Sequence, residues 1–292
     1  MTVIPPAGRD RADLSAAGFP AVLKPAARRS SSGVRAVTDG DELARCLASY
    51  PPGETLLVEE YVTGPEYSAE VLVKDGGIVF QSLTGKRTTE GSGEYFVELG
   101  HTVPAPDDPA NAALLAANRA IVERLQFENG IAHAELRLAP GGRPVLMEIA
   151  ARTPGDGLMA LYHLATGRPL EPAVIRIMLG DDVDYPEPRR CCRQVYLETA
   201  PGTLDDVRVS YRGFGHVEWS ADGEAWPEMV PGLPQDPPAL RAVLALKKRG
   251  DTVRRFTESD DRAVSFLIDA RSAAELDELE SAVRGSIDVL MS

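Results

Sequence analysis

Short apolar runs bounded by turn residues recur through the first third of the chain, a pattern typical of strands. A predicted hairpin turn, Asp75-Gly76-Gly77, separates two of these runs. One helical pattern interrupts them, with N-caps offered by Asp39 and Asp41 and an end after Tyr50. The expected strands are 21–24, 34–37, 55–62, 66–73 and 78–84. The pattern favours a mixed α+β domain rich in antiparallel sheet.

The middle of the chain predicts a helix, a hairpin and two shorter helices. Asp108-Pro109 supplies a cap and a first-turn proline for the first helix. The expected apolar stripe of that helix is Leu114, Ala117, Ile121 and Leu125. The hairpin is expected over 131–151, and the charged, proline-broken stretch 182–190 predicts a subdomain boundary.

The last hundred residues or so predict three strands and a closing helix. Ser272 and Glu275 form the pattern of a capping box at the start of that helix. The expected strands are 194–200, 215–219 and 263–270. The expected apolar face of the helix is Leu276, Leu279, Val283, Ile287 and Leu290.

Composition narrows the class of protein. The chain has 292 residues, 43% of them hydrophobic, which is enough for a substantial core. The formal charge of −13 argues against a general binder of nucleic acid or acidic membrane, although single sites for phosphorylated molecules remain compatible with it. Three cysteines form no disulfide framework, and no membrane span or leader peptide is evident, so a reduced, cytoplasmic protein is expected.

Two glutamates lie in the segment AHAELRLAPGGRPVLMEIAAR, residues 132–152. If Gly141-Gly142 is a two-residue turn, Glu135 and Glu148 face each other with Cβ atoms about 5 Å apart, where like charges repel. A bound cation would compensate, and Mg²⁺ is commonly held by one or two carboxylates together with substrate phosphates. Two alternatives stay open: a merely solvated acidic face, and the paired carboxylates of a glycosidase, although no other feature suggests a sugar cleft.

Two upstream segments carry candidate nucleotide chemistry. Lys24 ends an apolar strand in GFPAVLKP, directly before the Ser- and Arg-rich loop 26–33, so it could contact phosphate while loop amides close over it. A solvated strand end is the alternative. In VEEYVTGPEYSAEV, backbone near Glu60 and Val62 could meet an adenine edge and Glu66 could accept from ribose hydroxyls. An exposed acidic hairpin is the alternative here.

The order of these signals, a phosphate lysine and loop, an acidic hairpin, then facing glutamates and an arginine, resembles the ATP-grasp superfamily. Within it the chain is most similar to the carboxylate-amine ligases, such as D-alanine:D-alanine ligase and the L-amino-acid ligases. The resemblance implies an α+β ATP-grasp fold, in which two α+β subdomains clasp ATP, with a C-terminal α+β extension. It implies a lid subdomain over 1–63, a catalytic and metal-binding subdomain over 64–185, and the extension over 186–292.

The resemblance also implies roles for single residues. Lys24 would bind the ATP phosphates and act in catalysis, while Glu135 and Glu148 would be the Mg²⁺ ligands, with Mn²⁺ as an alternative ion. His133 and Arg137 share the strand face of Glu135 by period-two counting. The further nucleotide contacts implied are Ser31, Ser32 and Gly33 in the lid loop, Glu59, Glu60 and Val62 at adenine, Glu66 at ribose, and Lys86 near phosphate.

Arg152 resembles the arginine that stabilises the acyl phosphate or the substrate carboxylate in this group. The segment FVELGHTVPA, residues 96–105, resembles the substrate segment of the L-amino-acid ligases. It makes Glu98 and His101 candidates for binding an amino or carboxylate group, with a structural loop histidine as the alternative for His101. The substrates implied are a small-molecule carboxylate and an amine, one of them an amino acid.

The implied activity is an ATP-dependent carboxylate-amine ligase that forms an amide or peptide bond through an acyl phosphate. Two features depart from the family pattern: Ala150 stands where many members have asparagine, and the lid pattern begins near Met1, without the usual N-terminal domain. The second departure keeps open an ATP-binding module, or a partner subunit of a split ligase whose missing domain another chain supplies. A carboxylase acting on bicarbonate is a third alternative.

Overall fold

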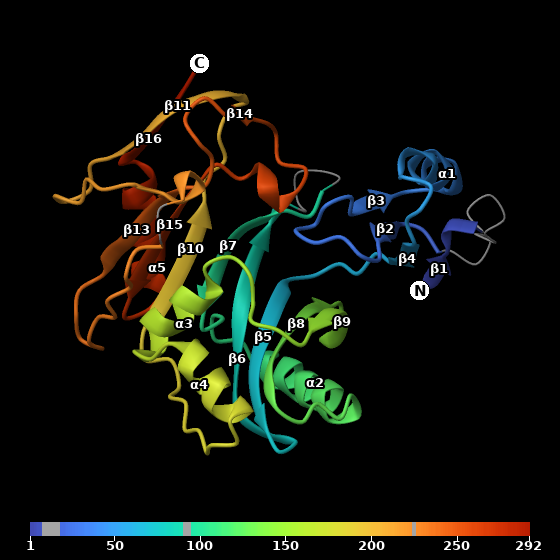
Figure 1. Cartoon of the computed structure of the whole chain (residues 1–292), viewed down its shortest axis with the longest axis horizontal. Coiled ribbons are helices and arrows are strands. Elements are labelled where there is room, and N and C mark those ends of the chain that lie inside the picture. The colour runs from blue at the N-terminus through green and yellow to red at the C-terminus, as the bar shows by residue number, and fades with distance from the viewer. Residues whose placement is uncertain (8–17, 90–94, 224–225) are drawn as a thin grey trace. The chain divides into compact units, whose positions relative to one another are not determined.

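A computed structural model of the chain describes residues 1–7, 18–89, 95–223 and 226–292 (Figure 1). The chain folds into two compact units. Unit 1 consists of Met1–Val62, Thr88–Glu98 and Arg254–Arg262. Unit 2 consists of Thr63–Arg87, Leu99–Val253 and Ala263–Ser292.

Unit 1 contains a four-stranded antiparallel sheet and helix α1 (Gly40–Ser49). The strand order is β1-β4-β2-β3, and the bounds are β1 (Thr2–Ile4), β2 (Ala21–Pro25), β3 (Arg35–Val37) and β4 (Leu56–Glu60). Leu43 and Leu47 of α1 join Leu23 and other strand residues in one buried cluster. The predicted cap of α1 is confirmed, because the side chain of Asp39 accepts from the backbone N–H of Glu42 at 2.8 Å.

Unit 2 is built around a nine-stranded sheet of order β12-β13-β15-β10-β7-β6-β5-β8-β9. Its strands are β5 (Glu66–Lys74), β6 (Gly77–Thr88), β7 (Glu98–Val103), β8 (Gly130–Ala139), β9 (Arg143–Ala150), β10 (Cys191–Tyr196), β12 (Glu218–Trp219), β13 (Ala239–Ala245) and β15 (Val264–Ala270). The last residue of β6 and the first residue of β7 belong to unit 1. Strands β10, β13 and β15 come from the region expected to form a C-terminal extension, so one sheet runs across the expected boundary after residue 185.

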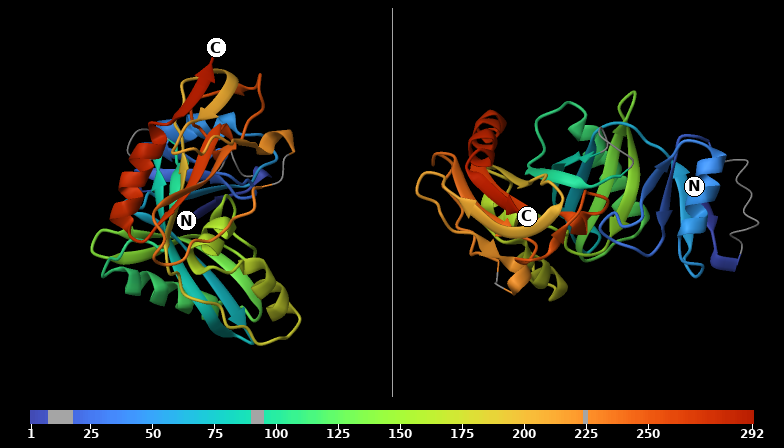
Figure 2. Two further views of the ribbon diagram at one scale, coloured as in Figure 1. Left: turned by 90° about the vertical axis from the view of Figure 1, so that its left-hand side faces the viewer. Right: turned by 90° about the horizontal axis from the view of Figure 1, so that it is seen from above.

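Helices α2 (Asn111–Arg124) and α5 (Ala273–Arg284) cover one face of this sheet, and α3 (Leu158–Thr166) and α4 (Leu170–Met178) cover the other (Figure 2). Successive side chains of β8 point to opposite faces of the sheet, as in any strand. Ala134 and Leu136 pack in the cluster that includes Leu114 of α2, whereas Ile131 packs with α3 and α4. The odd-numbered residues that follow Ile131 in β8 carry the charged chemistry.

Helix α2 forms as predicted, and its apolar stripe is confirmed except at its last residue. Leu114 is buried, and Ala117 and Ile121 are partly buried against the same cluster, whereas Leu125 is 59% exposed. The most buried positions of the helix also include Asn118 and Val122, which the predicted stripe does not contain. Asp108 does not occupy the N-cap position but accepts from the backbone N–H of Ala110, just before the helix.

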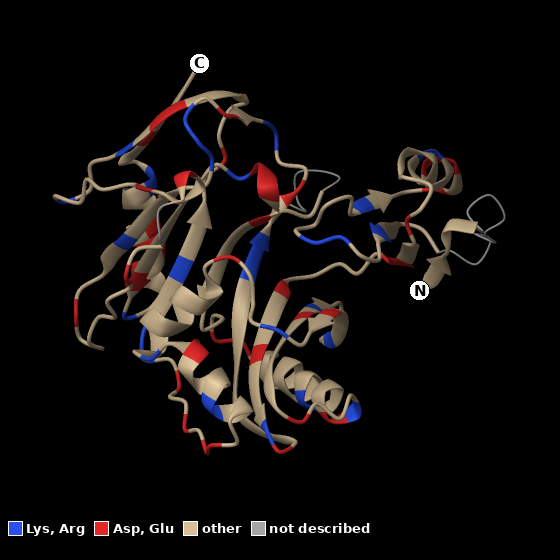
Figure 3. Cartoon of the chain, in the orientation of Figure 1, with Lys and Arg blue, Asp and Glu red and all other residues tan. Residues whose placement is uncertain are grey.

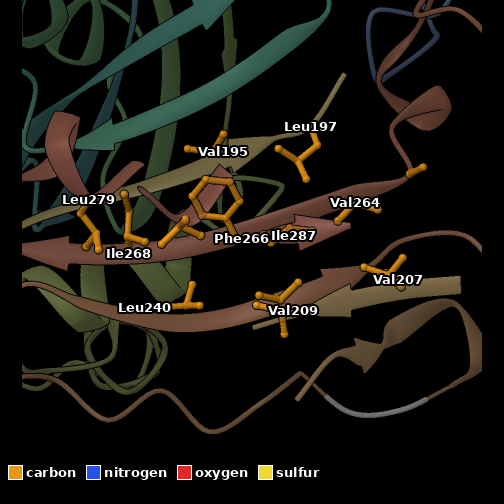
Figure 4. Close-up of a cluster of buried hydrophobic side chains, with 14 of the residues drawn as sticks. Val195, Leu197, Val207, Val209, Leu240, Val264, Phe266, Ile268, Leu279 and Ile287 are labelled. Carbon is orange, nitrogen blue, oxygen red and sulfur yellow. The ribbon is translucent and has the colours of Figure 1, made fainter. Parts of the chain in front are cut away.

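The closing helix α5 is shorter than predicted. It ends at Arg284, and the segment after it forms strand β16 (Ile287–Met291), which pairs with β11 (Gly202–Val209) in a sheet of order β14-β11-β16 that also contains β14 (Thr252–Val253). Ile287, Val289 and Met291 point inward at period two rather than continuing a helical face. Ile287 joins the buried cluster of Phe266 and Leu279 (Figure 4).

Ser272 caps α5 as predicted, accepting from the backbone N–H of Glu275 at 3.3 Å. The reciprocal bond of the predicted capping box is replaced in this part of the structure, because Glu275 accepts from the backbone of Arg271 instead. Glu280 lies on the face of α5 that turns toward the sheet, with a 9% exposed side chain, and accepts from Arg87 and Arg193 at 2.8 Å each. These ion pairs fix α5 against β6 and β10.

Among the residues that the structure describes, no helix combines the length and apolar character required to cross a bilayer.

Candidate functional site

Glu135 and Glu148 are direct cross-strand partners in β8 and β9, as the sequence predicts. The predicted two-residue turn is wrong, however. The strands close at Ala139 and Arg143, so that residues 140–142 form a three-residue loop, in which both glycines are left-handed (φ +80° and +76°). A register shift just after Glu135 offsets the extra loop residue. The bulge therefore restores the pairing that the turn alone would have displaced.

The charge of Glu135 is compensated by side chains of the same unit. The Lys86 Nζ atom lies 2.5 Å from Glu135 Oε1, and the His133 Nε2 atom lies 3.4 Å from the same oxygen. Burial opposes ionisation of Glu135, but the charge of Lys86 and the hydrogen bond with His133 hold its pKa well below the usual range. Repulsion between Glu135 and the exposed Glu148 is thus relieved without requiring a metal ion.

Glu70 anchors this arrangement from inside the unit. It is 1% exposed, and its two oxygens accept hydrogen bonds from Ser68, Thr84 and Tyr162, each at 2.8 Å. The fourth contact is with His133 Nδ1, also at 2.8 Å. Burial raises the pKa of Glu70, but the hydrogen bond and charge of His133 outweigh it, so that the pKa lies below its ordinary value.

His133 therefore bridges two carboxylates, Glu70 and Glu135. Burial lowers the pKa of the imidazole, but hydrogen bonds with Glu135 and Glu70 outweigh burial and raise this pKa to about 9. The imidazole is accordingly a cation at neutral pH, and both ring nitrogens donate.

Glu66, the predicted ribose acceptor, lies between two cations. Lys86 Nζ is 3.1 Å from Glu66 Oε1, and Arg137 Nη2 donates to Glu66 Oε2 at 2.7 Å. Lys86 and Arg137 have side chains 2% and 4% exposed. Figure 3 shows the acidic start of β5 beside the basic end of β6. We call the connected side chains on this face of the sheet the charged row: Glu66, Glu70, Lys86, His133, Glu135 and Arg137.

The sequence predicts part of the charged row. The common strand face of His133, Glu135 and Arg137 is confirmed by their contacts. The alternative of an exposed acidic hairpin does not hold at Glu70, which is 1% exposed, and the sequence gives no indication of the contact with Tyr162. One feature of the sequence could have grouped Glu70 with Glu66: in strand β5, Glu66, Ser68 and Glu70 lie on one face because alternate residues share a face. The burial of Glu70 could not be predicted from this segment, because it depends on contacts with residues distant in the sequence.

In unit 1, Lys24 and Glu59 form an ion pair, with Nζ and Oε2 2.7 Å apart and both side chains about four-fifths buried (19% and 18% exposed). They project from adjacent antiparallel strands, β2 and β4. The resemblance assigns Lys24 to phosphate and Glu59 to adenine, yet here the two side chains contact each other. Of the neighbouring adenine candidates, Glu60 is exposed and Val62 is buried.

The predicted lid loop follows β2 and has defined contacts. Gly33 is left-handed (φ +75°), and its carbonyl accepts from the Tyr50 hydroxyl at 2.5 Å. This backbone conformation favours glycine, and a Cβ on Gly33 would in addition crowd a Tyr50 ring carbon at 3.1 Å. Arg28 donates twice to Glu54, at 2.8 and 2.7 Å. Ser31 is also left-handed (φ +56°), and its carbonyl accepts from the backbone N–H of Val34 at 3.1 Å.

The substrate candidates lie in different units. Glu98, in unit 1, accepts from the Ser259 hydroxyl at 2.6 Å, and the backbone N–H of Ser259 donates to Ser30 O in the lid loop at 2.9 Å. His101, in unit 2, is 2% exposed, and its Nε2 atom lies 2.8 Å from Asp156 Oδ2. Each candidate is therefore held by a polar partner within its own unit.

Arg152 lies just beyond β9 and is exposed. Its Nη1 atom donates to the carbonyl of its neighbour Thr153 at 2.8 Å. Ala150, the position where many family members have asparagine, pairs with His133 across the β8–β9 ladder.

The described side chains include no group of three or more His, Cys, Asp or Glu residues that could hold a metal ion. The pair Glu135 and Glu148 nevertheless fits Mg²⁺. This ion is usually held by only one or two carboxylates, with phosphate oxygens and waters completing the octahedron. Glu148 is exposed, and Glu135 is ionised beside Lys86.

Residues 17–160 match the family model of the ATP-grasp domain. The chain therefore carries an ATP-grasp domain, and its mixed α+β architecture is the ATP-grasp fold, as the sequence predicts.

The chain also resembles several known proteins in sequence. It is 30% identical over 202 residues to the uncharacterized protein y4rH of Sinorhizobium fredii, covering 65% of this chain and 40% of that protein. It is 28% identical over 178 residues to a D-alanine–D-alanine ligase of Alcanivorax borkumensis (59% and 57%), and 27% identical over 205 residues to the alanine–anticapsin ligase of Bacillus subtilis (61% and 42%). The chain thus spans about half the length of the curated relatives it matches.

Among solved structures, the L-amino acid ligase from Bacillus licheniformis superposes with a TM-score of 0.72 at 19% identity. The alignment covers 94% of this chain and 64% of that one. At this identity the likeness establishes the fold alone, and it extends well past residue 160 into the strands and helix of the C-terminal region.

Proposed function

We propose that this chain is an ATP-dependent carboxylate-amine ligase, which forms an amide or peptide bond through an acyl phosphate and converts Mg-ATP to ADP and phosphate. One observation carries the proposal: an ATP-grasp sheet presents two facing carboxylates, Glu135 and Glu148, beside the buried cation Lys86. The relatives include a D-alanine–D-alanine ligase, an alanine–anticapsin ligase and an L-amino acid ligase, which supports an amino acid as one substrate.

In this proposal, Lys24 and the amides of Ser31, Ser32 and Gly33 bind the ATP phosphates. The contact between Lys24 and Glu59 supports it in one respect: the ion pair holds the ammonium in a defined position beside β4 until an anionic ligand arrives. Adenine is assigned to Glu59, Glu60 and Val62.

Glu135 and Glu148 would hold Mg²⁺, which when bound neutralises charge on the phosphate oxygens. Lys86 is close enough to Glu135 to share that task. Glu66 is assigned to the ribose hydroxyls, with Arg137 fixing its orientation through the 2.7 Å hydrogen bond.

Glu98, His101 and Arg152 are the proposed substrate residues. A carboxylate or acyl phosphate would be bound by Arg152, whose exposed guanidinium needs to give up only a backbone carbonyl. An amino group would be bound by an acceptor such as Glu98. Asp156 would orient the His101 ring through its hydrogen bond with Nε2.

The proposed reaction has two steps. An oxygen of the substrate carboxylate attacks the γ-phosphorus, the bond between that phosphorus and the β,γ-bridging oxygen breaks, and ADP leaves with the electron pair. The amine nitrogen next attacks the acyl carbon, the carbon–oxygen bond to phosphate breaks, and the nitrogen loses a proton. Because acyl phosphates hydrolyse readily, the lid loop is assigned to excluding water during the reaction.

The test is ADP release by the full chain with Mg-ATP and pools of amino acids, with product mass read in any active pool. Release that needs an amino acid and disappears in Glu148→Ala supports the ligase. Bicarbonate-dependent release instead would indicate a carboxylase. Mg-ATP binding without release in any pool would contradict stand-alone turnover, and would favour an ATP-binding module or a subunit that needs a partner chain.

A further inference from the structure

Lys86 is a buried lysine between two carboxylates. It lies near the end of β6, and its side chain is 2% exposed. Its Nζ atom is 2.5 Å from Glu135 Oε1 and 3.1 Å from Glu66 Oε1. The ammonium therefore lies against one of the two carboxylates that the proposed metal site would use.

An ammonium in that place competes with a divalent cation for Glu135. Mg²⁺ binds carboxylate oxygens at about 2.0–2.1 Å and keeps a near-octahedral shell of ligands. That shell and the Nζ atom cannot both occupy the space next to Glu135 Oε1. Repulsion acts in the same direction, because the ammonium and the divalent cation would lie only a few Å apart in a partly buried site, where water screens their charges poorly.

We infer that Lys86 is an internal counter-ion that closes Glu135 to free Mg²⁺, and that a polyphosphate ligand opens the site by drawing the ammonium away. The divalent cation then binds together with the nucleotide rather than before it. This inference rests on the proposed function, since it uses the same pair of carboxylates, and adds an order of binding to it.

The neighbouring contacts make this exchange inexpensive. When Lys86 leaves, Glu66 keeps Arg137, which donates to it from Nη2 at 2.7 Å and from Nε at 3.1 Å. Glu135 keeps His133, which Glu70 holds from its other ring nitrogen. Neither carboxylate is left buried without a cationic neighbour, so the large penalty for an uncompensated charge does not arise.

The test measures Mn²⁺ binding without nucleotide, by electron paramagnetic resonance and calorimetry, on the full chain. Lys86→Met is expected to bind Mn²⁺ about 10-fold more tightly than the wild type or better, because the competing charge is gone. Lys86→Arg keeps that charge and should bind as weakly as the wild type. Lys74→Met is the matched control, because this lysine of the same unit pairs with Asp75, outside the charged row.

Added Glu148→Gln should abolish the gain in the Lys86→Met background, since the gained ion would use both carboxylates. If Lys86→Met fails to fold by circular dichroism, Lys86→Gln serves in its place. No gain in Mn²⁺ affinity in a folded variant, or the same gain in Lys86→Arg, would overturn the inference.

Failure of this inference is distinguishable from failure of the proposed function. Wild-type binding of Mg-ATP that depends on Glu135 and Glu148, without any metal gain in the lysine variants, rejects the counter-ion role and leaves the ligase proposal standing. Absence of Mg-ATP binding in the wild type rejects both.

Discussion

His133 Nδ1 lies 2.8 Å from Glu70 Oε1, and through its other nitrogen the same ring faces Glu135. A fully buried carboxylate thus fixes the orientation of an imidazole, which in turn fixes a proposed metal ligand. Such supporting contacts determine how precisely a ligand is held. In this chain the support comes from β5 and β8, paired in register at Glu70 and His133.

Glu70→Ala should destabilise the protein strongly. The change leaves His133 and the Tyr162 hydroxyl without the buried acceptor that they share, so we expect a loss of about 3–5 kcal/mol in the free energy of unfolding. Urea unfolding provides the measurement. Glu123→Ala, at an exposed position of α2, should change it by no more than about 0.5 kcal/mol. Equal effects from the two changes would contradict the anchoring role.

Glu280 should make stability depend on acid pH. Burial raises the pKa of this carboxyl, but hydrogen bonds from Arg87 and Arg193 outweigh burial and lower the pKa from 4.5 to about 2. The folded state therefore binds this proton less readily than the unfolded state, so the contribution is fully present above about pH 4.5 and is lost as the pH falls toward 2.

Comparison of the wild type with Glu280→Gln isolates this contribution. The difference in unfolding free energy between the two proteins should shrink progressively below pH 4.5. If this difference stays constant from neutral pH down to about pH 2, the ion pairs of Glu280 are not its source.

Gly33→Ala should destabilise unit 1 and weaken ATP binding. The residue is left-handed, and an added Cβ would press on the Tyr50 ring, so the cost is about 1–2 kcal/mol. Gly53→Ala is the control, since a Cβ there meets no atom within 4 Å. Thermal unfolding and calorimetric ATP titration provide the two readouts. Unchanged ATP affinity despite lower stability would separate the loop from phosphate binding.

Glu148→Gln should raise the Mg²⁺ concentration required for ATP binding by about 10-fold or more, because one of two charged ligands is lost. ATP titrations at a series of Mg²⁺ concentrations would show the shift. Glu148 is exposed, so the change should leave stability nearly unaltered. An unaltered Mg²⁺ requirement would remove Glu148 from the metal site, and Glu123→Gln controls for the loss of one negative charge.

The sequence predicts what local spacing determines. The cap at Asp39, the strands β2, β3 and β4 of unit 1 and the facing of Glu135 and Glu148 follow from turn and cap residues within a few positions. The facing of Glu135 and Glu148 is predicted correctly only because two deviations cancel: the loop is one residue longer than predicted, and a bulge shifts the register back. Neither deviation is recognisable in the sequence.

Predictions from the sequence are wrong where contacts with residues distant in the sequence determine the structure. Ile287 fits the helical stripe of α5, yet pairing with β11 converts its segment to a strand. Glu70 fits the pattern of an exposed hairpin, yet β8 and the Tyr162 side chain of α3 bury it. The ion pair of Lys24 with Glu59 likewise depends on which strand lies next to β2.

The sheet order has a practical consequence for dissecting the protein. The family match ends at residue 160, but β7 is hydrogen-bonded to β10, and β10 to β15. A fragment cut at the domain limit would strip these neighbours from β7 and leave its backbone donors and acceptors as an open, adhesive edge. Minimal versions of this domain should therefore aggregate unless the C-terminal strands are retained.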